Sequence, residues 1–297
     1  PFYANTLDER GRRSSELYRS SAGGDFQVQV ASNIFMHEAY VDSIWYNIDQ
    51  SELRSNNNYR YSDLGFYYLA KLVEDIGGQP LDVYMQNEIY RSLGIYDIGF
   101  NPRERFVLDR IPPTELDNYW RKQTVHGYVH DMGAAMLGGV SGHAGLFGSA
   151  LNLAVIGQML LQNGVYGNKV YLRTEVIQQF ATRFTGASRR GLGFDMKQLN
   201  PSRSLNMANS ASSKAYGHLG FTGTCIWVDP EEELIFVFLS NRTFPSMRNN
   251  KLSRDSYRSR LQEVAYRSIT RSATMPPAVK PLPASTLPDH LESTRQP

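Results

Sequence analysis

The chain has 297 residues, and its 31 Lys and Arg against 29 Asp and Glu give a formal net charge of +2. This length suits one domain of mixed class or two small ones, and the near-neutral charge gives no electrostatic reason to expect a nucleic-acid partner. The single cysteine, Cys225, excludes an intrachain disulfide and a cysteine-rich zinc site. No apolar run approaches the ~18 residues of a membrane-spanning helix, so we expect no membrane span.

The first part of the chain carries few regular signals. Residues 1–33 have no sustained hydrophobic period, although a weak alternation over 25–30 indicates a short strand. Residues 33–46 contain scattered aromatic side chains, and we interpret them as irregular structure over a cleft.

Tyr61-Ser62-Asp63 comes directly before a predicted helix. Ser62 or Asp63 is a suitable N-cap, and two glycines end the helix after about residue 76. Its apolar stripe is too broad for a surface helix, so we expect the helix to be buried. The Tyr61 hydroxyl would then lie near the positive end of the helix dipole, which favours its ionised form. The alternative is that Tyr61 packs on the helix as a hydrophobic staple.

The middle of the chain alternates predicted helices with long loops. Residues 101–125 contain three prolines and are interpreted as a long excursion, and residues 137–148 form a Gly-rich loop without the Gly-Lys-Ser/Thr ending of a phosphate loop. Caps and apolar periods predict three helices, which extend from Pro80 to about Arg91, from Ala150 to Gln162 after the cap Ser149, and from Thr174 to about Phe184.

Several common catalytic patterns are missing. Gly139-Val140-Ser141-Gly142-His143 fails the Gly-x-Ser-x-Gly elbow at its last position, and no paired carboxylates indicate a glycosidase. His126, His130 and Asp131 have metal-like spacing, but no helical period places both imidazoles on one face. We therefore expect neither a metal site nor a cofactor.

The stretch 216–224 (YGHLGFTGT) leads into the most apolar run of the second half. Residues 225–228, an Asp-Pro turn and residues 233–239 predict a β-hairpin, and six consecutive apolar residues in its second strand predict that both faces are buried. Glycines at every third position leave backbone N–H groups open to a ligand, with His218 between them. The alternative is a Gly-rich bulge at a sheet edge.

The end of the chain is predicted as a short strand near residues 192–194 in a Gly-rich link, a closing helix and a tail. The helix covers residues 254–269, and its apolar stripe contains Tyr257, Leu261, Val264 and Ala265. We expect residues 1–269 to form one domain and the Pro-rich residues 270–297 to be a disordered extension. Central helices, a late hairpin and a closing helix favour an α+β fold, with an antiparallel sheet flanked by helices and a helical subdomain.

Three stretches together resemble the superfamily of serine β-lactamases and penicillin-binding proteins, in the branch of class C β-lactamases, esterases and D-aminopeptidases. Residues 61–66 (YSDLGF) resemble the Tyr-x-Asn box, and residues 137–147 (LGGVSGHAGLF) resemble the segment between the boxes. Residues 217–224 resemble the Lys-Thr-Gly strand in the variant in which His replaces Lys. The resemblance covers about residues 50–270 and implies the transpeptidase-like fold of that superfamily.

The resemblance also implies serine-hydrolase acyl transfer on an amide, ester or β-lactam carbonyl. Tyr61 would then handle the proton of the nucleophile, and His218 would tune Tyr61 and meet a substrate carboxylate. The Phe221 N–H, in the turn of Gly220 and Thr222, would be one oxyanion donor. Asp63 would contact the substrate where the family has Asn, but a carboxylate cannot donate a hydrogen bond as an amide does.

The nucleophile box is the largest departure from the family. None of the seven lysines has a serine three residues before it, so the sequence contains no Ser-x-x-Lys. We expect this box, its helix and the first sheet strands to lie before Pro1, and the chain to be inactive by itself. The alternative is a non-catalytic domain that binds cell-wall peptide or a protein partner. The resemblance further implies a small-molecule or peptide substrate, export to the bacterial periplasm, and in some relatives a fused glycoside hydrolase domain.

Overall fold

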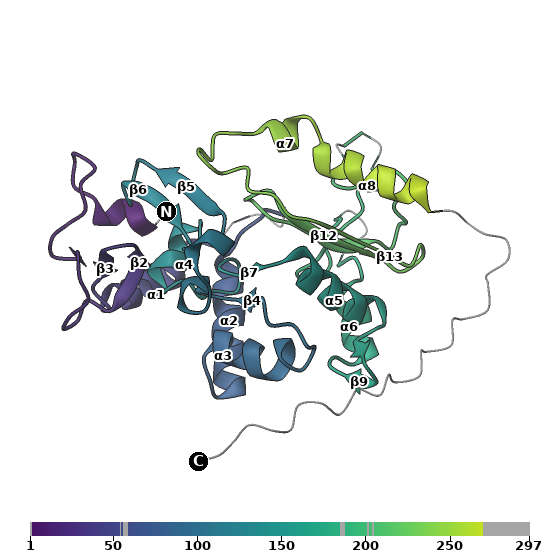
Figure 1. The fold of residues 1–297 in the computed structure, drawn as a ribbon, viewed down its shortest axis with the longest axis horizontal. Coiled ribbons are helices and arrows are strands. Elements are labelled where there is room, and N and C mark those ends of the chain that lie inside the picture. The colour runs from purple at the N-terminus through teal and green to yellow at the C-terminus, as the bar shows by residue number, and fades with distance from the viewer. Residues whose placement is uncertain are drawn as a thin grey trace, which may run out of the picture.

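A four-stranded antiparallel sheet organises the C-terminal half of the molecule, in the order β10-β11-β12-β13 (Figure 1). The computed structural model describes residues 2–53, 55, 59–184, 188–200, 202–203 and 205–269. All strand pairs in this part of the chain are antiparallel, and helices pack on the sheet, which confirms the predicted α+β class. The strands of this sheet are β10 (Asp195–Met196), β11 (Tyr216–Leu219), β12 (Cys225–Asp229) and β13 (Leu234–Phe238).

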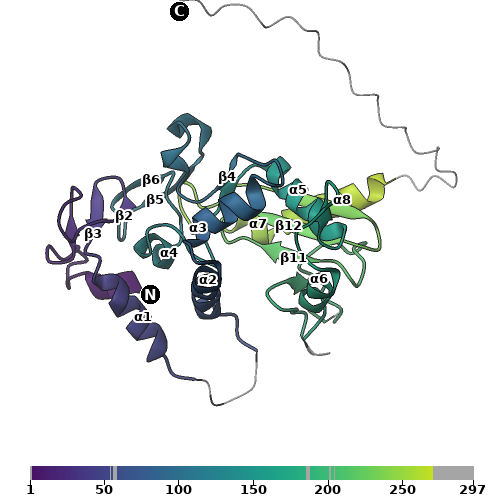
Figure 2. The ribbon, with the colours of Figure 1, turned by 90° about the horizontal axis from the view of Figure 1, so that it is seen from below.

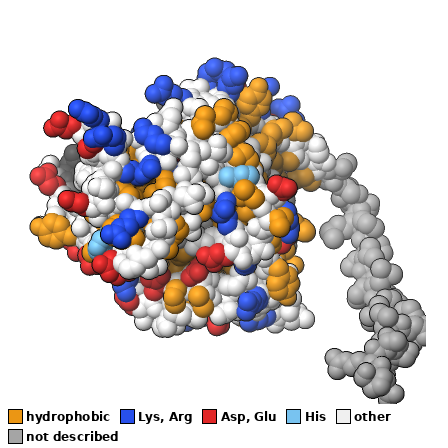
Figure 3. Space-filling model, turned by 60° about the vertical axis from the view of Figure 1, so that its left-hand side comes forward, with side chains coloured by type: hydrophobic (Ala, Val, Ile, Leu, Met, Phe, Trp, Pro, Cys, Tyr) orange, Lys and Arg blue, Asp and Glu red, His pale blue; other side chains and the backbone are white. Residues whose placement is uncertain are grey.

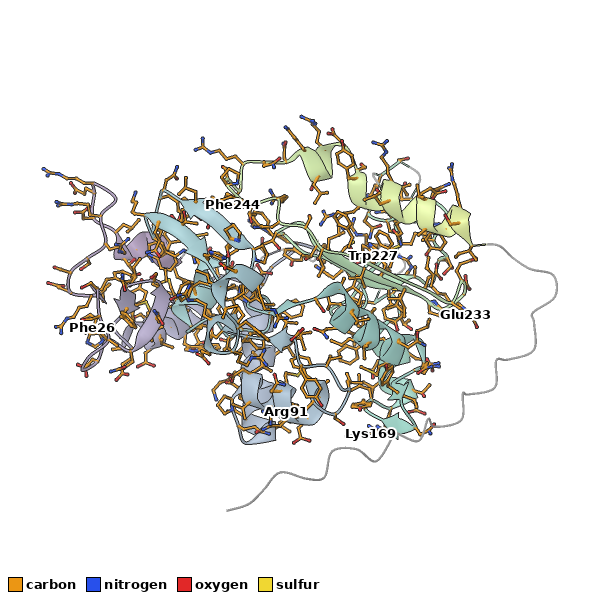
Figure 4. All side chains as sticks on the ribbon, viewed as in Figure 1. Phe26, Arg91, Lys169, Trp227, Glu233 and Phe244 are labelled. Carbon is orange, nitrogen blue, oxygen red and sulfur yellow. The ribbon has the colours of Figure 1, made fainter. Side chains whose placement is uncertain are left out.

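The hairpin of β12 and β13 forms as the sequence predicts. Trp227 lies opposite Phe236, and Glu233, at the turn in Figure 4, has a positive φ of 49°. The Gly-rich stretch is not a bulge at the sheet edge, because β11 pairs with β10 on one side and with β12 on the other. Gly217 is required inside β11, since a Cβ there would lie 2.0 Å from the Ile226 carbonyl oxygen.

Helices α5 (Ala150–Leu161) and α8 (Tyr257–Ser268) cover the two faces of this sheet (Figure 1). The predicted cap of α5 is present, because the Ser149 side chain accepts a hydrogen bond from the Asn152 N–H. Gly157 lets α5 approach the sheet closely, since a Cβ there would lie 2.7 Å from the Ile235 side chain. All five residues of β13 are nevertheless only half-buried, so the prediction of burial on both faces holds in part.

The predicted inward stripe of the closing helix is wrong. Leu261 and Val264 are exposed on α8, whereas Gln262 and Tyr266 are buried. Gln262 accepts a hydrogen bond from the Ala208 N–H at 2.8 Å, and Tyr266 packs in an apolar cluster with Trp227, so α8 buries a mixed polar and aromatic face. A four-residue helix, α7 (Lys251–Arg254), precedes α8 and is separated from it by Ser256 with φ 52°.

The N-terminal half contains the predicted helical subdomain. Figure 2 shows α1 beside a small three-stranded sheet, with α2 at its side. The residues interpreted as irregular, 33–46, instead form the middle strand of that sheet and most of α1. Their buried side chains alternate in the strand and then recur at helical spacing. The elements are β1 (Tyr18–Arg19), β2 (Val28–Ala31), β3 (Ile34–Met36), α1 (Tyr40–Asp49) and α2 (Leu64–Gly77).

Helix α2 follows the predicted bounds but not the predicted burial. It ends at Gly78, which adopts the left-handed conformation with φ 66°. Tyr67 is buried against the N-terminal core, whereas Leu69, Leu72 and Ile76 are exposed. The broad apolar stripe therefore does not mark a buried helix.

The predicted excursion at 101–125 also contains regular structure, since β5 and β6 form a hairpin whose ends contact the connection after β13. The helix from Thr174 ends earlier than predicted. The remaining elements are η1 (Phe2–Thr6), α3 (Leu81–Tyr84), η2 (Met85–Tyr90), β4 (Ile98–Gly99), η3 (Pro102–Glu104), η4 (Leu108–Arg110), β5 (Pro113–Asp117), β6 (Gln123–His126), α4 (Met132–Met136), β7 (Phe147–Gly148), β8 (Val165–Tyr166), β9 (Lys169–Val170) and α6 (Thr174–Phe180).

The predicted tail, residues 270–297, lies outside the described residues, so the proposed boundary after residue 269 stays a prediction. Within the described part of the chain, no helix combines the length and apolar character needed to cross a membrane.

Candidate active site

The structure brings Tyr61 and His218 together from sequence positions 157 residues apart. Tyr61 lies three residues before α2, and His218 is the third residue of β11. Their ring centroids are 6.2 Å apart, with an angle of 34° between the planes. The two predicted residues therefore share one site, and their catalytic roles stay predictions.

Arg190 completes this group and was not identified from the sequence. Its guanidinium carbon lies 5.4 Å from the centroid of the Tyr61 ring, and its Nη1 lies 2.9 Å from His218 Nε2. A guanidinium only donates hydrogen bonds, so His218 Nε2 accepts here. His218 Nδ1 lies 2.8 Å from the Leu219 carbonyl oxygen and therefore carries the proton. These contacts hold His218 as the neutral Nδ1–H tautomer.

Asp195 positions Arg190 at the edge of the sheet. Its buried carboxylate lies 2.6 Å from Arg189 Nε and 3.6 Å from Arg190 Nε, and residues 190 and 195 form an isolated antiparallel bridge. The sequence signal for Arg190 was weak because the residue lies in a Gly-rich link without a period. The pair of arginines before a predicted strand was the only feature that could have indicated it.

The surroundings of Tyr61 favour its neutral form, which corrects the expectation of an ionised phenol. Partial burial raises the pKa of Tyr61 above its ordinary value of 10.0, and the charge of Asp63 and its hydrogen bond with the phenol raise the pKa further. The Arg190 guanidinium lowers it by a smaller amount. Asp63, which stands where a helix cap was predicted, makes no capping bond with its side chain; Ser62 Oγ instead accepts from the Leu64 N–H at 3.2 Å.

The residues predicted to bind the oxyanion form a tight turn after β11. The Gly220 N–H donates to the Thr224 carbonyl at 2.7 Å, and the Thr222 carbonyl accepts from the Arg242 N–H at 2.8 Å. The Phe221 ring is 62% exposed, with the Arg242 guanidinium 4.3 Å from its centroid. In the described part of the chain, the Phe221 N–H has no hydrogen-bond acceptor, so it is available to a ligand.

A buried charged group supports the inner side of the Phe221 ring. His130 lies 5.3 Å from that ring, and its Nε2 is 3.5 Å from the Glu115 carboxylate. Arg121 joins Glu115 and Asp117 through ion pairs of 3.0 Å each. Burial raises the pKa of Glu115, but the nearby His130 imidazole, the Tyr119 hydroxyl that donates to the carboxylate and the Arg121 guanidinium together hold it below its usual value.

A second hydrogen-bonded group lies behind α2, and the sequence did not indicate it as a unit. Ser141 Oγ lies 2.9 Å from His143 Nδ1, and His143 Nε2 lies 2.9 Å from the Asp131 carboxylate. The His143 ring stacks on Tyr67 at 4.5 Å. Ser141 is only 4% exposed, so these hydrogen bonds orient His143 against α2 and do not present a hydroxyl to solvent.

The metal-like trio of the sequence is divided among separate partners. His126 Nε2 contacts the Ile111 carbonyl, His130 lies near Glu115, and Asp131 accepts from His143. Among the residues that the structure describes, no group of three or more His, Cys, Asp or Glu side chains could hold a metal ion.

The chain is similar to curated bacterial proteins. A putative D-alanyl-D-alanine carboxypeptidase of Escherichia coli K12 is 36% identical over 203 residues, which cover 64% of this chain and 46% of the relative. A protein of the same name from Salmonella schwarzengrund is 35% identical over 68% of this chain and 49% of the relative. The chain thus spans about half the length of these curated relatives.

Solved structures agree at the level of the fold. Simvastatin synthase from Aspergillus terreus superposes with a TM-score of 0.52 at 16% identity, covering 79% of this chain and 64% of that one. The profile of the Beta-lactamase family matches residues 13–257. The chain therefore belongs to the beta-lactamase family, within the superfamily of serine β-lactamases and penicillin-binding proteins.

Proposed function

We propose that Tyr61, Arg190 and His218 form one side of an acyl-transfer site for a peptide that ends in a free carboxylate. The family is one of serine hydrolases, and the curated relatives are named for D-alanyl-D-alanine carboxypeptidase activity. The observation that carries the proposal is the Arg190 guanidinium beside both rings, 2.9 Å from His218 and 5.4 Å from the centroid of Tyr61. A guanidinium keeps its charge at physiological pH and can bind a carboxylate through two parallel hydrogen bonds.

In this proposal Arg190 holds the substrate and Tyr61 transfers a proton. With a pKa above its ordinary value of 10.0, Tyr61 carries a proton at neutral pH and acts as a general acid toward the leaving amine. The guanidinium of Arg190 then stabilises the phenolate that remains. Neutral His218 fixes the orientation of Arg190 through its Nε2 lone pair.

The turn after β11 would receive the reacting carbonyl. The free N–H of Phe221 is the donor that we assign to the developing oxyanion, and Gly220 keeps the turn close, since a Cβ there would lie 2.0 Å from Thr224 Oγ1. Thr222 supplies the next polar side chain of the turn. Asp63 acts on the substrate through Tyr61 in this scheme, because its negative charge raises the pKa of the phenol.

The sequence has no Ser-x-x-Lys, so in this proposal the serine nucleophile is not one of these 297 residues. We propose that acyl transfer requires a segment carrying this box from outside the sequence, and that the protein acts on the cell-wall side of a bacterium. Within this scheme the chain supplies the proton-transfer and carboxylate-binding half of the site.

Peptide binding tests the Arg190 assignment. Isothermal titration should detect an acetylated peptide ending in D-Ala-D-Ala, with affinity about tenfold higher than for the same peptide with an amidated C-terminus, because the amide removes a charge-assisted contact. Arg190→Gln should abolish that difference, whereas Arg110→Gln, an exposed guanidinium paired with Asp97, should keep it. Equal affinity of the two peptides for the unchanged protein would refute the carboxylate site.

Covalent labelling tests the assignment of the nucleophile. The 297-residue chain should not react with a fluorescent penicillin, since no Ser-x-x-Lys serine is present. A labelled peptide containing Ser141, whose hydroxyl lies 2.9 Å from His143, would show that this chain carries its own nucleophile and would overturn the proposal.

The lack of a Ser-x-x-Lys box in the sequence also supports a second function. A domain that only binds cell-wall peptide needs Arg190 and the turn after β11 but no nucleophile. Addition of a separately produced Ser-x-x-Lys segment distinguishes the two functions. Peptide cleavage would support the enzyme, and unchanged peptide with retained binding would support the binding domain.

A further inference from the structure

A basic hollow lies in the N-terminal half of the molecule. Its lining shares no residue with the candidate active site. Its volume is about 420 Å³, and it is lined by four cationic side chains, Arg12, Arg13, Arg19 and Lys122. No Asp or Glu is among its lining residues, whereas Ser15, Ser20 and Asn33 add polar groups. Figure 3 shows several Lys and Arg side chains at the upper left of the visible face, with Asp and Glu side chains beside them.

Three of these four cations lack a carboxylate partner in the described part of the chain. Arg12 is paired with Asp8 at 2.8 Å. Arg13, Arg19 and Lys122 form no such pair among the described residues. Three cations of the hollow thus have no carboxylate paired with them among the described residues, and a bound anion would reduce their mutual repulsion.

Each of the three side chains is held in place by a contact that leaves donors free. Arg13 Nη1 donates to the Trp120 and Arg121 carbonyls at 2.6 and 3.1 Å. The Arg19 guanidinium lies 4.0 Å from the centroid of the Phe26 ring, at the outer end of this region in Figure 4. Lys122 Nζ donates to the Asn118 carbonyl at 2.8 Å.

The backbone that carries these groups is also fixed. Arg19 lies in β1, opposite Phe35 of β3. Asn33 and Lys122 both adopt positive φ angles, of 54° and 55°, which place their side chains at tight turns. One strand position and two turns therefore set where these side chains leave the backbone, which limits the backbone freedom lost when a ligand binds.

We propose that this hollow is a binding site for a phosphate-type oxyanion, separate from the acyl-transfer site. The guanidinium and ammonium groups of the lining can only donate hydrogen bonds, so they complement a ligand with several anionic oxygens. Guanidinium groups bind phosphate through paired hydrogen bonds, and an ammonium adds a point charge. Two or more cations match a doubly charged group better than a single carboxylate.

Phosphate could come from a soluble metabolite or from a lipid headgroup, and two probes distinguish these sources. Inorganic phosphate in isothermal titration tests the soluble ligand, and flotation with vesicles containing phosphatidic acid, whose headgroup is a phosphomonoester, against phosphatidylcholine vesicles tests the headgroup. Saturable binding to either probe supports the site, and the probe that binds identifies the source.

The variant pair Arg19→Gln and Lys122→Gln decides whether the hollow is responsible. The double variant should bind the effective probe about tenfold more weakly or worse, since each change removes a charge-assisted contact. The matched control, Arg91→Gln with Arg110→Gln, removes the same charge from the surface elsewhere. Equal losses in both double variants, no saturable binding to either probe, or acetate binding as tightly as phosphate would overturn the proposal. Unchanged far-ultraviolet circular dichroism of both double variants ensures that any loss reflects binding.

Discussion

Two arginine-centred groups meet the turn after β11, and they differ in how completely their hydrogen bonds are satisfied. Arg121 is 0% exposed, and it donates to Asp117, Glu115 and the carbonyls of residues 129 and 130. Arg190 is 17% exposed and donates to His218, with Asp195 at the longer distance of 3.6 Å. The first group has little capacity left for a ligand and serves the fold. The second keeps donors free beside a half-exposed phenol, as binding a substrate requires.

The largest effect should follow from breaking the buried group. Arg121→Met leaves Glu115 and Asp117 as uncompensated buried carboxylates, which should lower the free energy of unfolding by about 3–5 kcal/mol. Urea unfolding followed by circular dichroism measures this loss. The control Arg110→Met removes an exposed ion pair and should change stability by less than about 1 kcal/mol. Similar values for the two variants would mean that the buried group does not stabilise the fold.

Acid should weaken the same group more gradually. Glu115 and Asp117 have pKa values below their ordinary 4.5 and 3.8 despite their burial, because His130 stabilises the charged form of Glu115, backbone N–H groups stabilise that of Asp117, and Arg121 adds to both. A lowered pKa in the folded state contributes stability that is present above the ordinary pKa and is lost as pH falls through the folded value. The urea midpoint should therefore be steady from pH 7 to 5 and fall below about pH 4. In Glu115→Gln the fall should be shallower, and an unchanged slope would exclude Glu115 as a source.

Arg190 should matter for peptide binding and little for stability, in contrast to Arg121. Arg190→Gln should reduce peptide affinity while it changes the free energy of unfolding by less than about 1 kcal/mol, because Arg189 also pairs with the buried Asp195. Combined titration and urea data test both halves of this expectation. A stability loss as large as that of Arg121→Met would assign Arg190 to the fold rather than to the site.

The contrast also explains which parts were predictable from the sequence. The hairpin of β12 and β13 was predicted because its turn and apolar runs are local signals. Helix α8 misled because its orientation depends on distant partners, such as the bond from Tyr266 to Asp229 at 2.6 Å. A hydrophobic period does not record such contacts.

The site was predictable only in part for a related reason. Tyr61 and His218 were paired through family resemblance, since nothing in the residues between them encodes a distance. Arg190 was missed because it lies in an irregular link, where neither period nor motif marks a side chain as functional. The burial that raises the pKa of Tyr61 likewise arises from tertiary neighbours, so the sequence indicated only the helix dipole.

The smallest and most specific effect concerns the phenol of Tyr61, whose two charged neighbours act in opposite directions. Asp63→Asn should lower the pKa of Tyr61 toward its ordinary value of 10.0, because it removes a negative charge and a strong acceptor. Arg190→Gln should raise that pKa, because it removes the cation that stabilises the phenolate. The 13C resonance of the Tyr61 ring carbon, assigned by its loss in Tyr61→Phe, reports both titrations. Shifts in the same direction would show that Asp63 and Arg190 do not act on Tyr61 as separate charges, and the assignment of Tyr61 as a general acid held between them would fail.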